Sequence, residues 1–465
     1  MKVLPLLAGT GLLLAGAVTS RVLLPQASSQ TQHTTPDGAV PSIQANAKTD
    51  VGQGGRTFFM APPAQGGSLN NPGTKDKPFA QLKQFSDIAR PGDTLLLRGG
   101  LYTDSWGTTM TRSGSKEGGT ITYRNYPGEV PILDGCNDAK SRQSVCFYAF
   151  GDNHLSYVRI QGLVLRRWVR TGIGIGANYK DHSSTNDHID IRDNVVDECG
   201  QNGITLMFGH DDTVQHNLVS RTGYDPNMGS WSSNINLYKM TAGNNLVDGN
   251  VAFEGIDISD HHTDGNGLIL DLSSKDGLNG GITATNNVFF WNGGAGIALT
   301  SSGNATFENN TLWENGQEPT YINKGVGFVS WDASDGFVLR NNIAVQLQGV
   351  GIKLDHAYPK AVITHNLASG DAKFVSPRFV KAQSGDFRLH STSSGVDAGT
   401  TTGAPMRSIG LDPKVIQVQT SDQPVKWFKY APDLEYITHK GGLEKCFAPV
   451  QRPQGRGVDL GAYEQ

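Results

Sequence analysis

The chain has 465 residues, 58 of them glycine, and its 39 basic and 43 acidic side chains give a formal net charge of -4. This balance, with no Lys/Arg-rich run, excludes a basic nucleic-acid-binding protein, and a hydrophobic content of 37% excludes disorder over the whole length. The glycine content is well above the roughly 7% of average proteins, but the absence of a three-residue period excludes collagen.

The N-terminus has the pattern of an export signal. Lys2 precedes an apolar run from Val3 to Val18, which is shorter than the roughly 20 residues of a membrane-spanning helix. We therefore expect a signal peptide over 1–27, with an uncleaved anchor as the alternative. The mature protein is then secreted or periplasmic and has no stable membrane span. Residues 28–55 are polar and aperiodic, which predicts a linker.

Four cysteines occur, and no two of them form a C-x-x-C pair, so zinc-finger and thioredoxin motifs lack support. In an exported protein, Cys136 and Cys146 could close a short disulfide loop. Cys199 falls inside the repeat described next and is expected to be a small buried residue.

An Asn-apolar step recurs between residues 155 and 370. Its anchor positions are Asn194, Asn217, Asn250, Asn287, Asn310, Asn342 and Asn366. Their spacings of 23, 33, 37, 23, 32 and 24 indicate a period of 23–24 residues with three insertions of roughly ten. Such a period is too short for a propeller blade of about 40 residues, and the leucine-rich-repeat signature is missing.

A second element repeats with the same period: Gly or Asn, then apolar, any, apolar. It occurs at 172–175, 203–206, 234–237, 267–270, 296–299, 327–330 and 351–354. Alternation of this kind predicts strands with one buried face. The sequence therefore predicts an all-β solenoid, a right-handed parallel β-helix whose asparagines form a hydrogen-bonded ladder and whose glycines supply tight turns with positive φ.

Three segments carry a family resemblance: the entry segment 70–104, the Asn-rich repeats, and the C-terminal stretches 386–399 and 457–465. Together they resemble the pectate-lyase-like family of secreted bacterial single-stranded right-handed parallel β-helix proteins, above all polysaccharide lyase family nine. The resemblance implies a β-helix over 56–380 with a capping helix near 78–90, a C-terminal cap over 381–465, and a polysaccharide substrate bound along one sheet. We expect a monomer that binds no nucleic acid.

The strand register places the candidate site. If the leading Gly or Asn begins each strand, Ile235 and Leu237 point inward, whereas Asn236, Tyr238 and Asp271 point outward on neighbouring coils. The insertions 224–233, 255–266, 273–281 and 316–326 flank the same strands and would wall a groove. The centre of interest is therefore 203–273.

Within this region, the residue types suggest chemistry for β-elimination at an acidic sugar. A Lys, Tyr or His removes the proton next to a uronate carboxylate, while a cation neutralises that carboxylate. The candidate catalytic residues are Lys239, His262, Tyr238 and Lys275. The candidate substrate-binding residues are Asn236, Arg221, Trp231 and His210. The aspartates Asp257, Asp260, Asp264 and Asp271 are candidate ligands of Ca²⁺.

The chain departs from the resemblance at Asn266 and Ile269, where carboxylates would be expected, which puts the family's calcium site in doubt. Lys353, in a strand that looks like the family's lysine strand, is a secondary candidate. We predict a polysaccharide lyase; an epimerase shares its proton abstraction. The alternatives are a glycoside hydrolase using two of Asp211, Asp212, Asp264 and Asp271, or a non-catalytic carbohydrate-binding protein that stacks sugars on Trp231, Trp331 and Tyr238.

Overall fold

The computed structural model describes residues 54–103, 107–135, 145–149, 154–176, 185–225, 231–333, 335–419 and 425–465. They belong to one compact unit, Lys48–Gln465. The expected signal peptide, nearly all of the expected linker, and Cys136 lie outside the described residues. No helix in the described part is long and apolar enough to cross a membrane.

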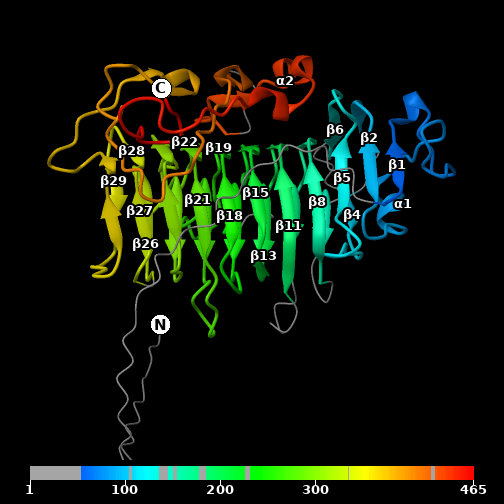
Figure 1. Cartoon of the computed structure of the whole chain (residues 1–465), viewed down its shortest axis with the longest axis horizontal. Coiled ribbons are helices and arrows are strands. Elements are labelled where there is room, and N and C mark those ends of the chain that lie inside the picture. Colours follow the sequence, from blue (N-terminus) through cyan, green and yellow to red (C-terminus); the bar gives the residue numbers. More distant parts are fainter. Residues whose placement is uncertain are drawn as a thin grey trace, which may run out of the picture. The chain divides into compact units, whose positions relative to one another are not determined.

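Three parallel sheets, here called A, B and C, run the length of the solenoid, and each full coil adds one strand to each of them (Figure 1). Sheet A contains β1 (Thr57–Met60), β2 (Thr94–Leu97), β5 (Ile121–Asn125), β8 (Ser156–Gln161), β11 (Asn186–Arg192), β15 (Thr213–Gln215), β18 (Asn245–Asp248), β21 (Ile282–Thr285), β24 (Thr306–Glu308), β27 (Val338–Arg340) and β30 (Val362–Thr364), with β14 (Gly209–His210) beside β11. Sheet B contains β3 (Gly100–Tyr102), β6 (Pro131–Asp134), β9 (Val164–Arg166), β12 (Val195–Asp197), β16 (Leu218–Ser220), β19 (Val251–Phe253), β22 (Val288–Phe290), β25 (Thr311–Trp313), β28 (Ile343–Val345) and β31 (Leu367–Ala368). Sheet C contains β4 (Thr108–Thr109), β7 (Phe147–Ala149), β10 (Ile173–Ile175), β13 (Ile204–Met207), β17 (Ile235–Tyr238), β20 (Leu268–Asp271), β23 (Ile297–Thr300), β26 (Val326–Trp331) and β29 (Val350–Lys353). The predicted right-handed parallel β-helix is confirmed.

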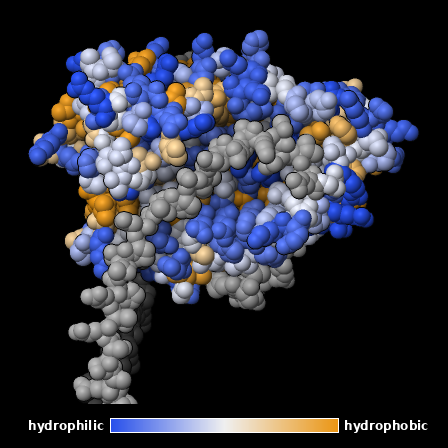
Figure 2. Space-filling model, viewed as in Figure 1, coloured by the Kyte–Doolittle hydropathy of each residue, from blue (hydrophilic) through white to orange (hydrophobic). Residues whose placement is uncertain are grey.

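The predicted strand register is also confirmed. Ile204, Ile235, Leu268 and Ile297 pair directly across β13, β17, β20 and β23, and each is at most 1% exposed. Aligned stacks of this kind fill the interior of the solenoid. By contrast, the face seen in Figure 2 is hydrophilic over much of its area. Charged pairs such as Arg159–Asp190 (2.7 Å) join neighbouring strands of sheet A. Cys146, Cys199 and Cys446 are buried free thiols.

The asparagine ladder lies at the corner between sheets A and B. The Oδ1 of Asn217 accepts hydrogen bonds from the backbone N–H and the Nδ2 of Asn194, both at 3.1 Å, and the pattern continues to Asn366. The residue before each ladder asparagine has a positive φ, for example 58° at Asp193 and 57° at Asn341. Most of these left-handed positions therefore belong to Asn, Asp or His, which tolerate this region better than other non-glycine residues do.

The glycines that begin the sheet C strands have a different role from the one expected. Gly203 and Gly267 are not among the residues with positive φ. A Cβ at Gly203 would lie 2.2 Å from Val219, and one at Gly267 would lie 2.7 Å from the carbonyl oxygen of Gly296. These glycines are required because the chain passes too close to its neighbours at this corner to accommodate a side chain.

The N-terminal coil is covered by α1 (Leu82–Ser86), which is shorter than the expected 78–90. The helix has a capping box between Gln81 and Gln84. Phe85 is fully buried, and its ring contacts Phe58 and Tyr123. The helix thus closes the first apolar layer of the interior, as a solenoid end requires.

The C-terminal segment does not stay at the end of the solenoid. It comprises β32 (Phe379–Lys381), β33 (Asp386–Leu389), β34 (Ile416–Val418), β35 (Tyr430–Pro432) and α2 (Leu434–Lys440), with short 3-10 helices at Ala382–Ser384, Pro413–Val415 and Leu443–Cys446 (a further one, Pro63–Gln65, lies near β1). It runs back along the outer face of sheet B (Figure 1) and buries an apolar row that includes Val195, Val251 and Phe290. Glu444 of this segment accepts a hydrogen bond of 3.4 Å from the amide Nδ2 of Asn125, the last residue of β5. We call residues 381–465 the C-terminal strap.

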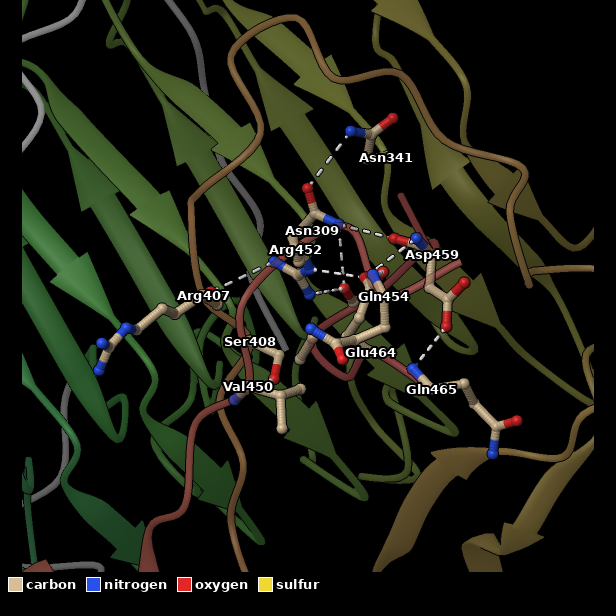
Figure 3. Close-up of polar contacts among 12 residues, drawn as sticks. Asn309, Asn341, Arg407, Ser408, Val450, Arg452, Gln454, Asp459, Glu464 and Gln465 are labelled. Atoms are coloured by element: carbon tan, nitrogen blue, oxygen red, sulfur yellow. Dashed lines mark hydrogen bonds and ion pairs between the residues drawn. The ribbon is translucent and has the colours of Figure 1, made fainter. Parts of the chain in front are cut away.

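The last residues of the strap are fixed by a buried polar network (Figure 3). Arg452 is paired with Glu464 at 3.1 Å, and their side chains are 1% and 0% exposed. Arg452 also donates to Asn286, and the Nδ2 of Asn309 donates to the backbone carbonyl of Asp459 at 2.9 Å. The buried Arg452 charge is therefore compensated by Glu464, which a buried ion pair needs.

Candidate active site

The outer face of sheet C forms the floor of the candidate site. Thr205, Asn236 and Ile269 align in one column, and Met207, Tyr238, Asp271 and Thr300 align in the next. Adjacent strands lie about 4.8 Å apart, so Tyr238 and Asp271 are direct neighbours. The sequence-based register correctly placed these two side chains on one face.

Lys239 completes a compact polar group beside this pair. It occupies the corner after β17 with φ of 49°, the same left-handed position that Phe208, Leu272 and Asp332 hold in other coils. Its ammonium lies 2.6 Å from Asp276 and 5.9 Å from the centre of the Tyr238 ring. Its side chain is 15% exposed. The group of Tyr238, Lys239, Asp271 and Asp276 is called the central cluster below.

The electrostatics of the central cluster separate the roles of its members. Burial raises the pKa of Asp271 to about 6, although a backbone N–H and Lys239 partly offset that effect. The hydrogen bond that Lys239 donates to Asp276 raises the pKa of Lys239, so this ammonium stays charged at neutral pH. Burial also raises the pKa of Tyr238, which keeps the phenol protonated. The cluster thus offers a carboxylate that titrates near neutral pH, a fixed cation and a neutral hydroxyl donor.

The described residues of the insertions before β17 and β20 precede these strands at one end of the floor, and they are called the wall below. Trp231 and His261 stack with ring centres 4.2 Å apart and an angle of 17° between the rings. The Nδ1 of His262 lies 2.7 Å from the hydroxyl of Thr320 and 3.9 Å from Glu318, so it is tied to the insertion before β26. His262 therefore belongs to the wall and is not part of the central cluster.

The other two candidate lysines lie elsewhere: Lys275 in the segment after β20, and Lys353 at the end of β29, in the outward column that contains Asn236 and Ile269. Lys275 pairs with Asp332 at 2.9 Å, and both side chains are well exposed. Lys353 is bound to Asn323 by a short hydrogen bond. Lys239 likewise has an acceptor in Asp276, so what sets it apart from these two lysines is its position beside Tyr238 and Asp271.

The insertion over 316–326 closes part of the floor. Tyr321 is buried and packs with Val326 over Ile269, Ala298 and Val329, the apolar outward residues of three successive coils. This cover ends the first column of the groove at Ile269. The polar floor therefore extends from the central cluster toward β13.

Of the four aspartates proposed as calcium ligands, Asp257 and Asp264 lie near each other, but the four do not form one site. Asp257 and Asp264 are buried in the insertion before β20, at 1% and 6% exposure, whereas Asp260 is exposed and Asp271 lies at the far end of that strand. Burial raises the pKa of Asp264 to about 8, so it is mostly protonated at neutral pH. Among the described residues, no three His, Cys, Asp or Glu side chains are grouped to hold a metal. The residues present do not fit a Ca²⁺ site of the expected kind.

Other predicted residues lie outside the central cluster. Arg221 is 7% exposed and is paired within the solenoid with Asp197 and with Glu198 at 2.9 Å. His210 lies on β14, beside sheet A, and contacts Asp211 at 2.8 Å. Asp212, at 2% exposure, accepts the backbone N–H of Ile189 in an internal ladder. These interactions are structural.

Two residues of the site were not anticipated. Asp276, which holds Lys239, falls in the insertion 273–281, from which only Lys275 was a candidate. Tyr321 covers the floor from a segment 50 residues away in sequence from Asp271. The insertion pattern indicated that these loops flank the groove, but no local motif identified their contacts.

Comparisons with known proteins agree with this architecture. The chain is 34% identical over 133 residues to the uncharacterized protein YwoF of Bacillus subtilis (strain 168), a match that covers 28% of this chain and 27% of that protein. It is 38% identical over 69 residues to the pectate lyase PEL9 of Emericella nidulans, covering 15% and 17%. The chain thus matches about a quarter or less of the length of these relatives.

The crystal structure of the pectate lyase Pel9A superimposes with a TM-score of 0.53 and 16% identity, covering 88% of this chain and 96% of that one. At this identity the match shows the shared fold. A family model described as Pel9A-like, right handed beta helix region, matches residues 61–372. The chain therefore belongs to the Pel9A-like family of right-handed β-helix proteins.

Proposed function

We propose that this protein is an exported, monomeric polysaccharide lyase that cleaves a uronic-acid-containing polysaccharide by β-elimination. The observation that carries the proposal is the central cluster, in which Tyr238 and Asp271 share one face of sheet C and Lys239 lies at the corner beside them. Membership of a family named after a lyase, and the local identity with a pectate lyase, support the same class of reaction.

Lys239 is assigned to the substrate carboxylate. Its raised pKa makes it unsuited to remove a proton at neutral pH, but keeps it cationic. A cation paired with the uronate carboxylate lowers the pKa of the adjacent C5–H, which is the chemical requirement of the first step. The role that sequence analysis gave to calcium is thus filled by a side chain of this protein.

Asp271 and Tyr238 are assigned to the proton transfers. Asp271, ionised above pH of about 6, removes the C5 proton. The C4–O bond then breaks as the C4–C5 double bond forms, and the Tyr238 hydroxyl donates its proton to the departing glycosidic oxygen. Proton exchange with solvent restores both side chains. This assigns Asp271 a different role from the metal ligand first considered.

Two of the carboxylates first considered for hydrolysis, Asp212 and Asp264, are buried, and this favours elimination. A glycosidase needs two carboxyl groups that both reach the sugar. Of the candidates, Asp212 is 2% exposed and Asp264 is 6% exposed, and both have internal partners. The second carboxylate of the central cluster, Asp276, is exposed but is held in the ion pair with Lys239, and Asp211 contacts His210.

The test is digestion of polygalacturonate and other uronans, followed by ultraviolet absorbance of the new unsaturated ends and by reducing-end assay. We expect absorbance and reducing ends to rise together, and Asp271→Asn, Lys239→Met and Tyr238→Phe each to lower kcat/KM by at least about 100-fold. Lys116→Met, an exposed lysine before β5, is the matched control. Reducing ends without absorbance would show hydrolysis and refute the proposal.

A further inference from the structure

The wall residue Trp231 is an exposed aromatic side chain that is held against a second ring. The side chain is 56% exposed, and its ring lies parallel to that of His261 at 4.2 Å. Single exposed apolar side chains are common on protein surfaces, so the feature that distinguishes Trp231 is the fixed parallel stack with His261.

The backbone beneath the stack is built to hold it. Trp231 has φ of 54°, a conformation that is a true outlier for a bulky residue. It does not belong to the corner positions that repeat from coil to coil. Two hydrogen bonds join the insertions next to Trp231. The backbone N–H of Gly265 donates to the carbonyl of Ser232 at 2.6 Å, and the backbone N–H of Asn266 donates to the hydroxyl of Ser233.

We infer that Trp231 and His261 form a sugar-stacking subsite, separate from the central cluster, that binds the apolar face of one pyranose ring of a polysaccharide. Aromatic faces carry partial negative charge, and the C–H groups on a pyranose face carry partial positive charge. The subsite therefore recognises ring shape and does not depend on a uronate carboxylate. The inference rests on the proposed function only in that the ligand is a polysaccharide.

Charge-independent recognition distinguishes this subsite from Lys239. Attraction between an ammonium and a carboxylate is screened by salt, whereas stacking is not. Binding through the Trp231–His261 subsite should accordingly persist in concentrated salt and extend to an uncharged polymer.

The experiment titrates the full chain carrying Asp271→Asn, which prevents cleavage, with polygalacturonate and with galactan, an uncharged polymer, at low and high salt. Tryptophan fluorescence and calorimetry report binding. We expect Trp231→Ala to abolish the fluorescence response. The same substitution should weaken the binding of both polymers by up to about tenfold at high salt. Trp231→Phe should retain most of the affinity, His261→Ala should be intermediate, and Trp427→Phe, in the C-terminal strap, is the matched control. Unfolding curves confirm that each variant is folded.

Unchanged affinity of the Trp231→Ala variant for both polymers would overturn the inference, as would a loss seen only at low salt or only with polygalacturonate. The two proposals can fail separately. Absence of unsaturated products from every uronan, with the Trp231 response intact, would refute the lyase and leave the subsite standing. Elimination activity and polymer binding that are both unchanged by Trp231→Ala would refute the subsite and leave the lyase standing.

Discussion

Asp264 offers a direct test of how the insertion before β20 is organised. It is 6% exposed, accepts the hydroxyl of Thr263 at 2.8 Å, and is held near Asp257. Its pKa rises from 3.8 to about 8, first because burial disfavours the charge and second because Asp257 repels it. The variant Asp264→Asn keeps the shape of the side chain and removes the titration.

The sign of the effect follows from proton binding. Because the folded-state pKa is raised, the folded protein binds this proton more tightly than the unfolded chain does. The free energy of unfolding therefore falls as pH rises between 3.8 and about 8. At about 1.4 kcal/mol for each pH unit, the loss reaches about 4 kcal/mol at pH 7. We expect Asp264→Asn to be near neutral at pH 4 and more stable than the native chain by up to about that amount at pH 7.

Urea unfolding of both chains between pH 4 and pH 8 measures this difference. Asp260→Asn, an exposed acid in the same insertion, is the control and should change stability by less than about 0.5 kcal/mol. Destabilisation of Asp264→Asn at pH 7 would refute the reasoning. So would Ca²⁺ stabilising the native chain but not the variant, because Asp264 would then be an ionised metal ligand.

Four further predictions concern the fold and the central cluster. Asn250→Ala leaves buried ladder groups unpaired and should lower the urea-unfolding free energy by about 3 kcal/mol. Glu464→Gln leaves the buried Arg452 charge uncompensated, at a cost of about 3–5 kcal/mol in the same assay. Tyr321→Ala uncovers the apolar outward column and should cost about 3–5 kcal/mol, with increased binding of a hydrophobic dye. If Asp271 is the base, kcat/KM should fall about tenfold per unit below pH of about 6 and level off above it, and a flat profile would contradict that role.

The parts of the fold that sequence could predict are those with a local repeat. Alternating residues such as Ile235 and Leu237 fix which face of a strand is buried, and Asn250 marks a corner because its amide satisfies both backbone and side-chain groups of the coil before it. The same register placed Tyr238 beside Asp271. These features depend on contacts between equivalent positions, which a period in the sequence reveals.

The features that sequence could not predict depend on contacts between unlike positions. The sequence suggested that Asp212 and Arg221 could contact the substrate. Both side chains are instead buried where neighbouring coils stack. Asp264 is a residue type that commonly binds calcium, but its burial raises its pKa and keeps it protonated. The path of the C-terminal strap depends on a row of sheet B side chains contributed by many coils, each of them unremarkable alone.

The strap also changes how the molecule can come apart. In a simple solenoid each coil contacts only its neighbours, so stability is nearly a sum of local terms and the ends can fray. Here Glu444 lies against Asn125 near the beginning of the solenoid, while Asp459 is bound to Asn309 several coils later. One segment thus spans the stack and links coils that share no direct contact. Loss of any one coil weakens the strap's hold on the others, so cooperativity in this protein extends beyond nearest neighbours.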